Sequence, residues 1–208
     1  MTMTTATDLV TRVRTNVNEP TGQTDPLRSD VEIIQWLEDG VHDYMSKVPA
    51  EAFPSMQTSK TFSASSCTLP ADYLKLIVVV IDHTMSGSGT TTVTMTDKAY
   101  MLRSDENWLA ANWPVGPGAW AQFQGASILV GPHPVSGTLT YLKKPGTLST
   151  SSSTFDLPAQ HEEPVVNYAT AMALGKVNDT DAERYLTSYN TRIKAENAKY
   201  GEPLVETK

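Results

Sequence analysis

Apolar residues recur every three to four positions between residues 29 and 48, the spacing of one helix face. They are Val31, Ile34, Leu37, Val41, Tyr44, Met45 and Val48. Ser29 followed three residues later by Glu32 is the pattern of a capping box, and Pro49 ends the stretch. Gly40 costs about 1 kcal/mol of helix propensity relative to alanine, so it marks either a close backbone approach or a neutral substitution. We predict a helix over residues 29–48 with a buried apolar face.

A second helix is predicted upstream, over residues 5–17. Leu9, Val13 and Val17 lie on one face at helical spacing. Thr7 is the expected N-cap, because its hydroxyl can accept from a backbone N–H of the first turn.

Two more helices are predicted in the last quarter of the chain. Residues 159–177 are helical in pattern, and Pro164 fits such a helix only in its first turn or at a kink. Thr180 and Glu183 form another capping box, from which helical spacing continues to Gly201, a residue suited to a helix end.

Between residues 58 and 146 the chain is instead rich in Thr, Ser, Val, Gly and Pro, with short apolar runs between turn signals. The clearest strand is residues 73–82, followed by a hairpin turn at residues 86–89 and the alternating run of residues 90–96. We predict a short helix over residues 98–112. The remaining predicted strands are residues 120–123, 128–130 and 138–142.

These patterns predict an α+β fold in which N- and C-terminal helices form a four-helix bundle. A small antiparallel β domain, a barrel or a sandwich, is inserted between them. The expected division is a helical half over residues 1–57, the β domain over 58–147, the second helical half over 148–200, and an extended tail over 201–208.

Composition narrows the class of function. The net charge of −7 argues against a protein that grips nucleic acid by neutralising phosphates. Cys67 is the single cysteine, which excludes an intrachain disulfide and a Cys-based zinc site. The first ten residues lack a basic and apolar leader pattern, and the longest apolar run, residues 76–81, is too short to span a bilayer. We expect neither Sec export nor membrane insertion.

Candidate catalytic and metal-binding patterns are weak. His161-Glu162-Glu163 resembles the start of a zincin motif, but Val165 stands where the second histidine is needed. Asp39 and Asp43 lie one helical turn apart, where a solvated helix face explains them better than paired catalytic carboxylates. We therefore predict no catalytic residue, metal or cofactor. A small hydrolase built on Asp39, Asp43 or His161 remains an alternative.

Three tryptophans, Trp108, Trp113 and Trp120, lie close together in sequence among Pro and Gly. Two interpretations apply to this cluster. It is either the local core of a small β domain or an exposed aromatic loop that docks a protein or a sugar.

Three passages resemble the head-to-tail adaptor, or connector, proteins of tailed bacteriophages, including the tail tubular protein A type. The first is the helical stretch of residues 29–49. The second is FQGASILVGPHPVSGTLTYLKKP, which ends in the Tyr-x-x-x-Pro pattern at Tyr141 and Pro145. The third is FDLPAQHEEPVVNYATAMALGKVNDTDAERYLTSYNTRI, with a Leu-Pro opening and a Tyr-bearing final helix. The resemblance extends over nearly the whole chain, and the order and spacing of the three passages carry it.

The resemblance implies a virion protein, made in the host bacterial cytoplasm and located at the head-tail junction. It implies a homo-oligomeric ring, usually dodecameric, that binds the portal protein, extends the DNA channel and docks the next tail component, a nozzle or tail tube. DNA would pass through without specific binding, and an acidic chain suits such a conduit.

The residues expected at protein interfaces are Trp36, Trp108, Trp113, Trp120, Pro203, Leu204 and Val205. We expect the first two helices and the C-terminal tail to meet the portal, and the tryptophan region to meet a neighbour or the tail. The alternative function is a fibre- or baseplate-associated module that binds a glycan or a protein.

Overall fold

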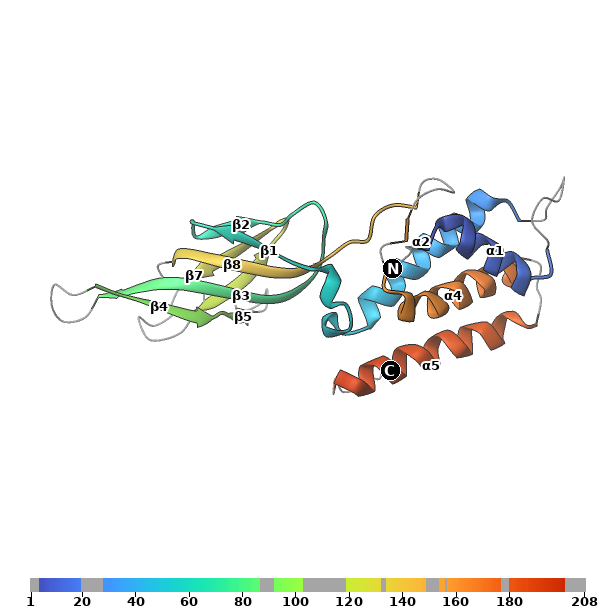
Figure 1. The fold of residues 1–208 in the computed structure, drawn as a ribbon. Helices are drawn as coiled ribbons and strands as arrows, with labels where there is room; N and C mark the ends of the chain where they lie inside the picture. The colour runs from blue at the N-terminus through green and yellow to red at the C-terminus, as the bar shows by residue number, and fades with distance from the viewer. Residues whose placement is uncertain are drawn as a thin grey trace. The chain divides into compact units, whose positions relative to one another are not determined.

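The computed structural model describes most of the chain in two compact units (Figure 1). The described residues are 4–19, 28–86, 92–102, 119–131, 134–148, 154–155, 157–176 and 180–200. The helical unit comprises Met1–Met56 and Lys144–Lys208, and the β unit is Gln57–Lys143.

The helical unit is built from four helices within the described residues. They are α1 (Ala6–Asn16), α2 (Asp30–Lys47), α4 (Glu162–Gly175) and α5 (Ala182–Tyr200). Short 3-10 turns follow α2 and precede α4, namely η1 (Ala50–Ala52), η2 (Pro54–Met56) and η4 (Ala159–His161). Helix α4 packs against each of the other three, so it is the centre of the unit (Figure 1).

Capping boxes fix the start of α1 and α2. In α2 the Ser29 hydroxyl accepts from the backbone N–H of Glu32, whose carboxylate accepts from the N–H of Ser29, as the sequence predicts. In α1 the same arrangement joins Thr5 and Asp8. The expectation that Thr7 caps this helix is therefore wrong. Thr5 takes the role because an acid stands three residues after it.

The buried face of α2 is rotated from the predicted stripe. Val31 is 76% exposed, whereas Ile33, absent from that stripe, is fully buried. Gly40 is also buried and faces Tyr168 of α4. Since α2 packs along the line of Ile33, Leu37 and Gly40, the prediction was correct for the helix and partly wrong for its orientation.

Helices α4 and α5 follow the predicted ranges with small shifts. Pro164 lies in the first turn of α4, where a missing N–H costs little. Helix α5 begins at Ala182, so Asp181, and not the predicted Thr180, stands directly before its first residue.

A buried charge network ties the end of α1 to α2 and α4. Glu19 accepts from both Arg14 and Arg28, and all three side chains are less than a tenth exposed. Arg28 Nε also donates to the carbonyl of Ala173 near the end of α4. Buried charges are tolerated here because each is paired and hydrogen-bonded.

The β unit contains two four-stranded sheets, ordered β1-β8-β3-β4 and β2-β7-β6-β5. The strands are β1 (Gln57–Phe62), β2 (Ser66–Thr68), β3 (Tyr73–Ser86), β4 (Thr92–Lys98), β5 (Tyr100–Leu102), β6 (Trp120–Gln124), β7 (Ser127–Gly131) and β8 (Pro134–Lys143). All neighbouring pairs are antiparallel except β5 and β6, which are parallel.

One core joins both sheets, which makes the β unit a sandwich. Its buried members are Cys67, Val79, Ile81, Ala119, Ala121, Ile128, Val130, Leu139 and Tyr141. The described strands do not form a closed barrel. The α+β class is confirmed, and of the two predicted architectures for the β region the sandwich applies.

The predicted helix over residues 98–112 is wrong at its start. Lys98 ends β4, and residues 100–102 form β5. Strand pairing decides this local structure, because β5 lies against β6 with Tyr100 opposite Trp120. The rest of that range lies outside the described residues.

Candidate protein-interaction site

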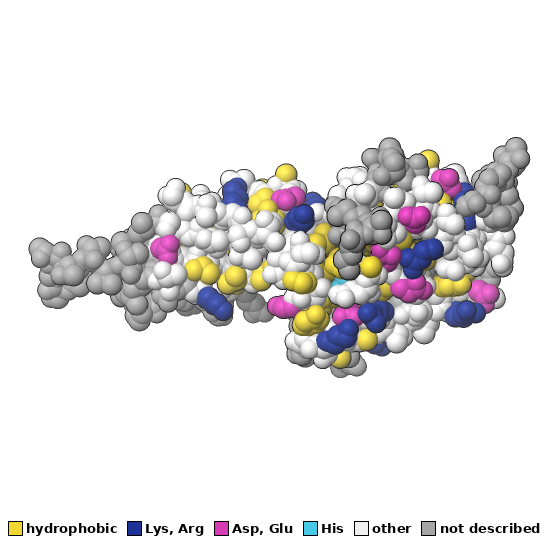
Figure 2. Space-filling view, in the orientation of Figure 1, with side chains coloured by type: hydrophobic (Ala, Val, Ile, Leu, Met, Phe, Trp, Pro, Cys, Tyr) yellow, Lys and Arg dark blue, Asp and Glu magenta, His cyan; other side chains and the backbone are white. Residues whose placement is uncertain are grey.

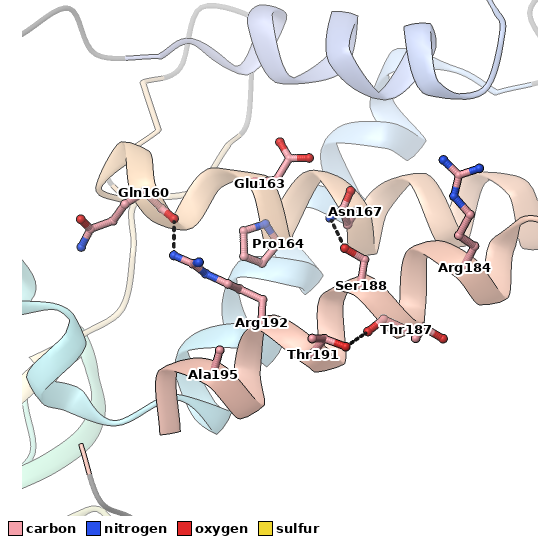
Figure 3. A pocket seen from close by; sticks show the side chains of 10 residues that line it. All are labelled: Gln160, Glu163, Pro164, Asn167, Arg184, Thr187, Ser188, Thr191, Arg192 and Ala195. Atoms are coloured by element: carbon pink, nitrogen blue, oxygen red, sulfur yellow. Dashed lines mark hydrogen bonds between the residues drawn. The ribbon is translucent and has the colours of Figure 1, made fainter. Parts of the chain in front are cut away.

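A groove of about 610 Å³ runs between α4 and α5 (Figure 3). Its lining is Gln160, Glu163, Pro164, Asn167, Arg184, Thr187, Ser188, Thr191, Arg192 and Ala195. Gln160, Arg192 and Ala195 lie toward one end, and Arg184 lies toward the other (Figure 3). The groove therefore follows much of the length of α5.

Hydrogen bonds span the groove at two levels. Asn167 Nδ2 donates to Ser188 Oγ at 3.2 Å, and an Arg192 guanidinium N–H donates to the Gln160 carbonyl at 3.5 Å (Figure 3). Two arginines and three hydroxyl side chains leave a lining rich in donors. Such a surface suits a peptide that brings carboxylates and carbonyl oxygens.

The carboxylate in the lining is already paired. Glu163 bonds to one Nη of Arg12 from α1, while the other Nη bonds to Glu162 at 3.0 Å. Arg12 also lines a smaller hollow between α1 and α4, on the other side of Glu163. The arginines in the lining are Arg184 and Arg192, and Arg192 pairs with Glu196 of its own helix.

Tyr189 anchors α5 to the helices beneath the groove. Its hydroxyl donates to Asp43 Oδ2 of α2 at 2.6 Å, and its ring packs edge-on against Tyr168 of α4. Burial, and then the hydrogen bond to Asp43, raise the pKa of Tyr189 well above its ordinary value. The phenol is therefore protonated and donates throughout the physiological range.

His161 connects α2 and η1 with the start of α4. Its Nε2 lies 3.1 Å from the Ala52 carbonyl oxygen and 3.1 Å from the side-chain amide nitrogen of Gln160. Its Nδ1 lies 3.1 Å from the Tyr44 hydroxyl. Burial lowers the pKa of His161, which keeps the ring neutral at pH 7. Burial, and then the charge of Glu196, raise the pKa of Tyr44 to about 12.

Glu196 holds the end of α5 together. Its carboxylate is only 3% exposed and accepts from Arg192 at 3.0 Å and from Lys199 at 2.8 Å. Arg192 is thus oriented by its own helix while its side chain stays 41% exposed. This geometry fixes one cation at the end of the groove.

The residues considered for hydrolysis have structural contacts in the helical unit. Asp43 accepts from Tyr189 and Lys47, and Asp39 accepts from Gln35 on the helix surface. Across the described parts of the chain, His, Cys, Asp and Glu side chains form no group of three or more placed to hold a metal ion. No described helix is long and apolar enough to cross a bilayer.

Of the interface residues expected from sequence, the structure describes Trp36 and Trp120, one in each unit. Trp36 is half-buried on α2 of the helical unit. Trp120, on β6, is 9% exposed and packs so closely against Gly131 that a Cβ there would lie 2.5 Å from its ring. Trp108, Trp113 and the expected tail contacts at positions 203–205 lie outside the described residues.

Sequence reasoning missed the groove entirely. Its residues come from η4, α4 and α5, and half of them are Thr, Ser, Asn or Ala, residue types that carry no functional motif. The available signal was that α5 is mostly polar. Only Tyr189, Ile193 and Glu196 of this helix are buried, which leaves a long polar surface beside α4. Figure 2 shows charged side chains of both signs gathered over the helical unit and fewer over the described part of the β unit.

A family model described as the SU10 adaptor protein matches residues 4–205 of the chain. No curated protein matches it.

Proposed function

This chain belongs to the SU10 adaptor protein family of bacteriophage head-to-tail adaptors, and from that premise we propose that it assembles as a ring beneath the portal. In this proposal the ring, of twelve copies, extends the DNA channel and docks the next tail component. The family match over residues 4–205 carries the proposal, because it includes both structural units.

The physical properties of the chain support an assembly role without catalysis. The lining of the α4–α5 groove is rich in hydrogen-bond donors, and Asp43 and His161 have structural partners. A net charge of −7 suits a channel wall along which DNA must slide, since lysine contacts to phosphates would hold it.

The proposed interfaces lie at several parts of the chain. Helices α1 and α2 and the tail at positions 203–205 contact the portal, with Trp36 as a half-buried contact on α2. The region containing Trp108, Trp113 and Trp120 faces a neighbouring copy or the tail. In this proposal Trp120 acts by supporting that region, since its own ring is almost fully covered.

The direct test is the native mass of the purified protein, measured by light scattering on a sizing column. The protein is run alone and after mixing with the portal protein of the same virus. A complex with about one copy per portal subunit supports the proposal. A stable trimer that does not bind the portal would overturn it.

A truncation after Tyr200 tests the tail contact separately. It removes residues 201–208 and leaves α5 complete. We expect weaker portal binding with an unchanged helical circular dichroism signal. Unchanged portal affinity would remove the tail from the proposed interface.

A further inference from the structure

Helix α5 is the least buried of the helices described in the helical unit. Three of its 19 residues are buried, compared with 10 of the 14 residues of α4. It lies at the outside of the unit beside α4, which also packs against α1 and α2 (Figure 1). Local opening starts where few buried contacts are lost. Separation of α5 therefore leaves the packing of α1, α2 and α4 on one another intact.

Two apolar side chains, Tyr189 and Ile193, hold α5 in place. Tyr189 packs its ring on Tyr168 of α4 and donates its hydroxyl to Asp43 of α2 at 2.6 Å. The third buried residue, Glu196, pairs within its own helix and so contributes little to docking. Since most helical stability in proteins comes from tertiary packing, a separated α5 would also lose helical structure.

His161 lies at the place where α2, η1 and α5 meet. The residue is 1% exposed, and its ring contacts the Tyr44 hydroxyl of α2 and the Ala52 carbonyl of η1. The Phe53 ring packs on it with the ring centroids 4.8 Å apart. The Tyr44 ring lies 6.1 Å from that of Tyr189, so the same cluster reaches the main anchor of α5.

Three charged side chains of α5 act on His161, namely Glu196, Arg192 and Lys199. Glu196 already accepts from both cations, from Arg192 at 3.0 Å and from Lys199 at 2.8 Å. A positive charge on the His161 ring would therefore be buried beside two cations whose anion is already shared. Separation of α5 removes these cations and admits water, so His161 binds a proton more readily in the separated state.

We propose that α5 separates from the rest of the helical unit as one piece in the free protein, and that His161 takes up a proton when it does so. Because the separated state binds the extra proton, its population rises as the pH falls below about 6.5, the ordinary pKa of histidine. The increase between pH 7.5 and 5.5 is at most about tenfold for one such group. This device belongs to the single chain and goes beyond the proposed function, since it requires neither a ring nor a portal.

Amide hydrogen exchange of the full-length free protein, read by mass spectrometry of peptides, tests the proposal. Rates are measured from pH 7.5 to 5.5 and divided by those of the unfolded chain at the same pH, which gives protection factors. At pH 7.5 we expect peptides within residues 182–200 to be at least about tenfold less protected than peptides within residues 165–173. The protection of α5 should then fall about threefold to tenfold by pH 5.5. Equal protection of the two helices, or an α5 protection that does not change with pH, overturns the proposal.

A pair of histidine variants tests which group takes up the proton. His161→Gln keeps hydrogen-bonding capacity but cannot titrate, so the protection of α5 should become independent of pH over this range. His42→Gln is the matched control, because His42 is exposed on α2, and the fall in α5 protection should persist in it. A fall that survives in His161→Gln assigns the proton to another group and overturns the proposal.

A second pair of variants tests whether α5 opens separately, and it does not depend on the folding of His161→Gln. Tyr189→Phe removes the hydrogen bond to Asp43, which the separation of α5 breaks, so α5 protection should fall about tenfold. Val13→Ala trims a fully buried side chain of α1, whose packing on α2 and α4 persists when α5 separates. It should lower the protection of α4 about tenfold and that of α5 by at most about twofold. An equal fall in both helices would mean that α5 opens only with the whole unit, which overturns the proposal.

Discussion

At the scale of single residues, Gly40 sets how closely α2 approaches α4. A Cβ at this position would lie 2.9 Å from Cδ1 of Tyr168 and 3.4 Å from its Cβ. The base of the ring, and not only its tip, would have to move. The same ring packs on Tyr189, so the displacement would extend to α5.

We expect Gly40→Ala to lower the free energy of unfolding by about 1 kcal/mol and Gly40→Val by about 3 kcal/mol, because overpacking outweighs the gain in helix propensity. Denaturant unfolding followed by circular dichroism measures both. Gly175→Ala is the control, since a Cβ at Gly175 meets no atom within 4 Å. An equally stable Gly40→Val variant would contradict this account of the α2–α4 contact.

His161 gives stability a dependence on pH. Its folded-state pKa is lowered by burial, so the unfolded chain binds its proton more readily. The stability that follows is fully present above the unfolded pKa of about 6.5 and is lost as pH falls below it. Glu196 opposes this shift, while Arg192 and Lys199 reinforce it.

Unfolding free energies measured from pH 7.5 down to 5.5 should therefore decrease, by at most about 1.4 kcal/mol per pH unit for this one group. His161→Gln should lower stability at pH 7.5 and flatten the profile. A slope that is the same in the variant would assign the pH dependence to other groups.

At the scale of elements, Glu19 holds the connection between α1 and α2. Its carboxylate serves both Arg14 and Arg28, and Arg28 continues to the Ala173 carbonyl of α4. Removing the negative charge leaves two buried guanidinium groups without their shared anion. The loss would therefore act on three helices at once.

We expect Glu19→Gln to lower the free energy of unfolding by about 3 kcal/mol, the usual cost of breaking a buried ion pair from one side. Glu163→Gln is the matched control. It breaks an ion pair with Arg12 in which the carboxylate is 66% exposed, so its effect should stay below about 1 kcal/mol. Similar effects of the two changes in chemical denaturation would disprove a special role for Glu19.

At the scale of the whole molecule, charge governs contact with DNA. The chain has 16 Lys and Arg side chains against 23 Asp and Glu, and many described arginines are engaged by carboxylates. Phosphate contacts require cations that are free to release counterions. The protein should therefore repel a duplex more than it attracts it.

We expect no retardation of a short DNA duplex in a native gel at physiological salt with up to about 10 µM protein, where nonspecific DNA-binding proteins already bind. A fluorescence anisotropy titration at lower salt provides the control for weak binding. Retardation at about 1 µM, with affinity falling steeply as salt rises, would contradict a channel wall that DNA passes without binding.

Local signals in the sequence were sufficient where the interacting atoms are close along the chain. Ser29 and Glu32 complete a capping box within one turn, and the apolar run that begins at residue 73 forms β3. The α+β class follows from such signals. At the start of α1 the signal was also local, because Thr5 and Asp8 form a capping box within one turn, and the prediction of Thr7 chose the wrong residue. At residues 100–102 the local pattern predicted a helix, but pairing with β6 decides their conformation.

Sequence by itself thus determined most of the helical and extended segments, the charge that the chain carries and, through the order of its motifs, its resemblance to adaptor proteins. Only the tertiary structure decided that Ile33 and not Val31 is buried, because Ile33 and Ile34 are both apolar and the partner helix selects the face. It also decided the groove, whose residues come from η4, α4 and α5 and form one surface only when Tyr189 of α5 packs on α2 and α4. Periodicity records which residues can be buried, whereas a site depends on contacts between residues far apart in sequence, which no local pattern encodes.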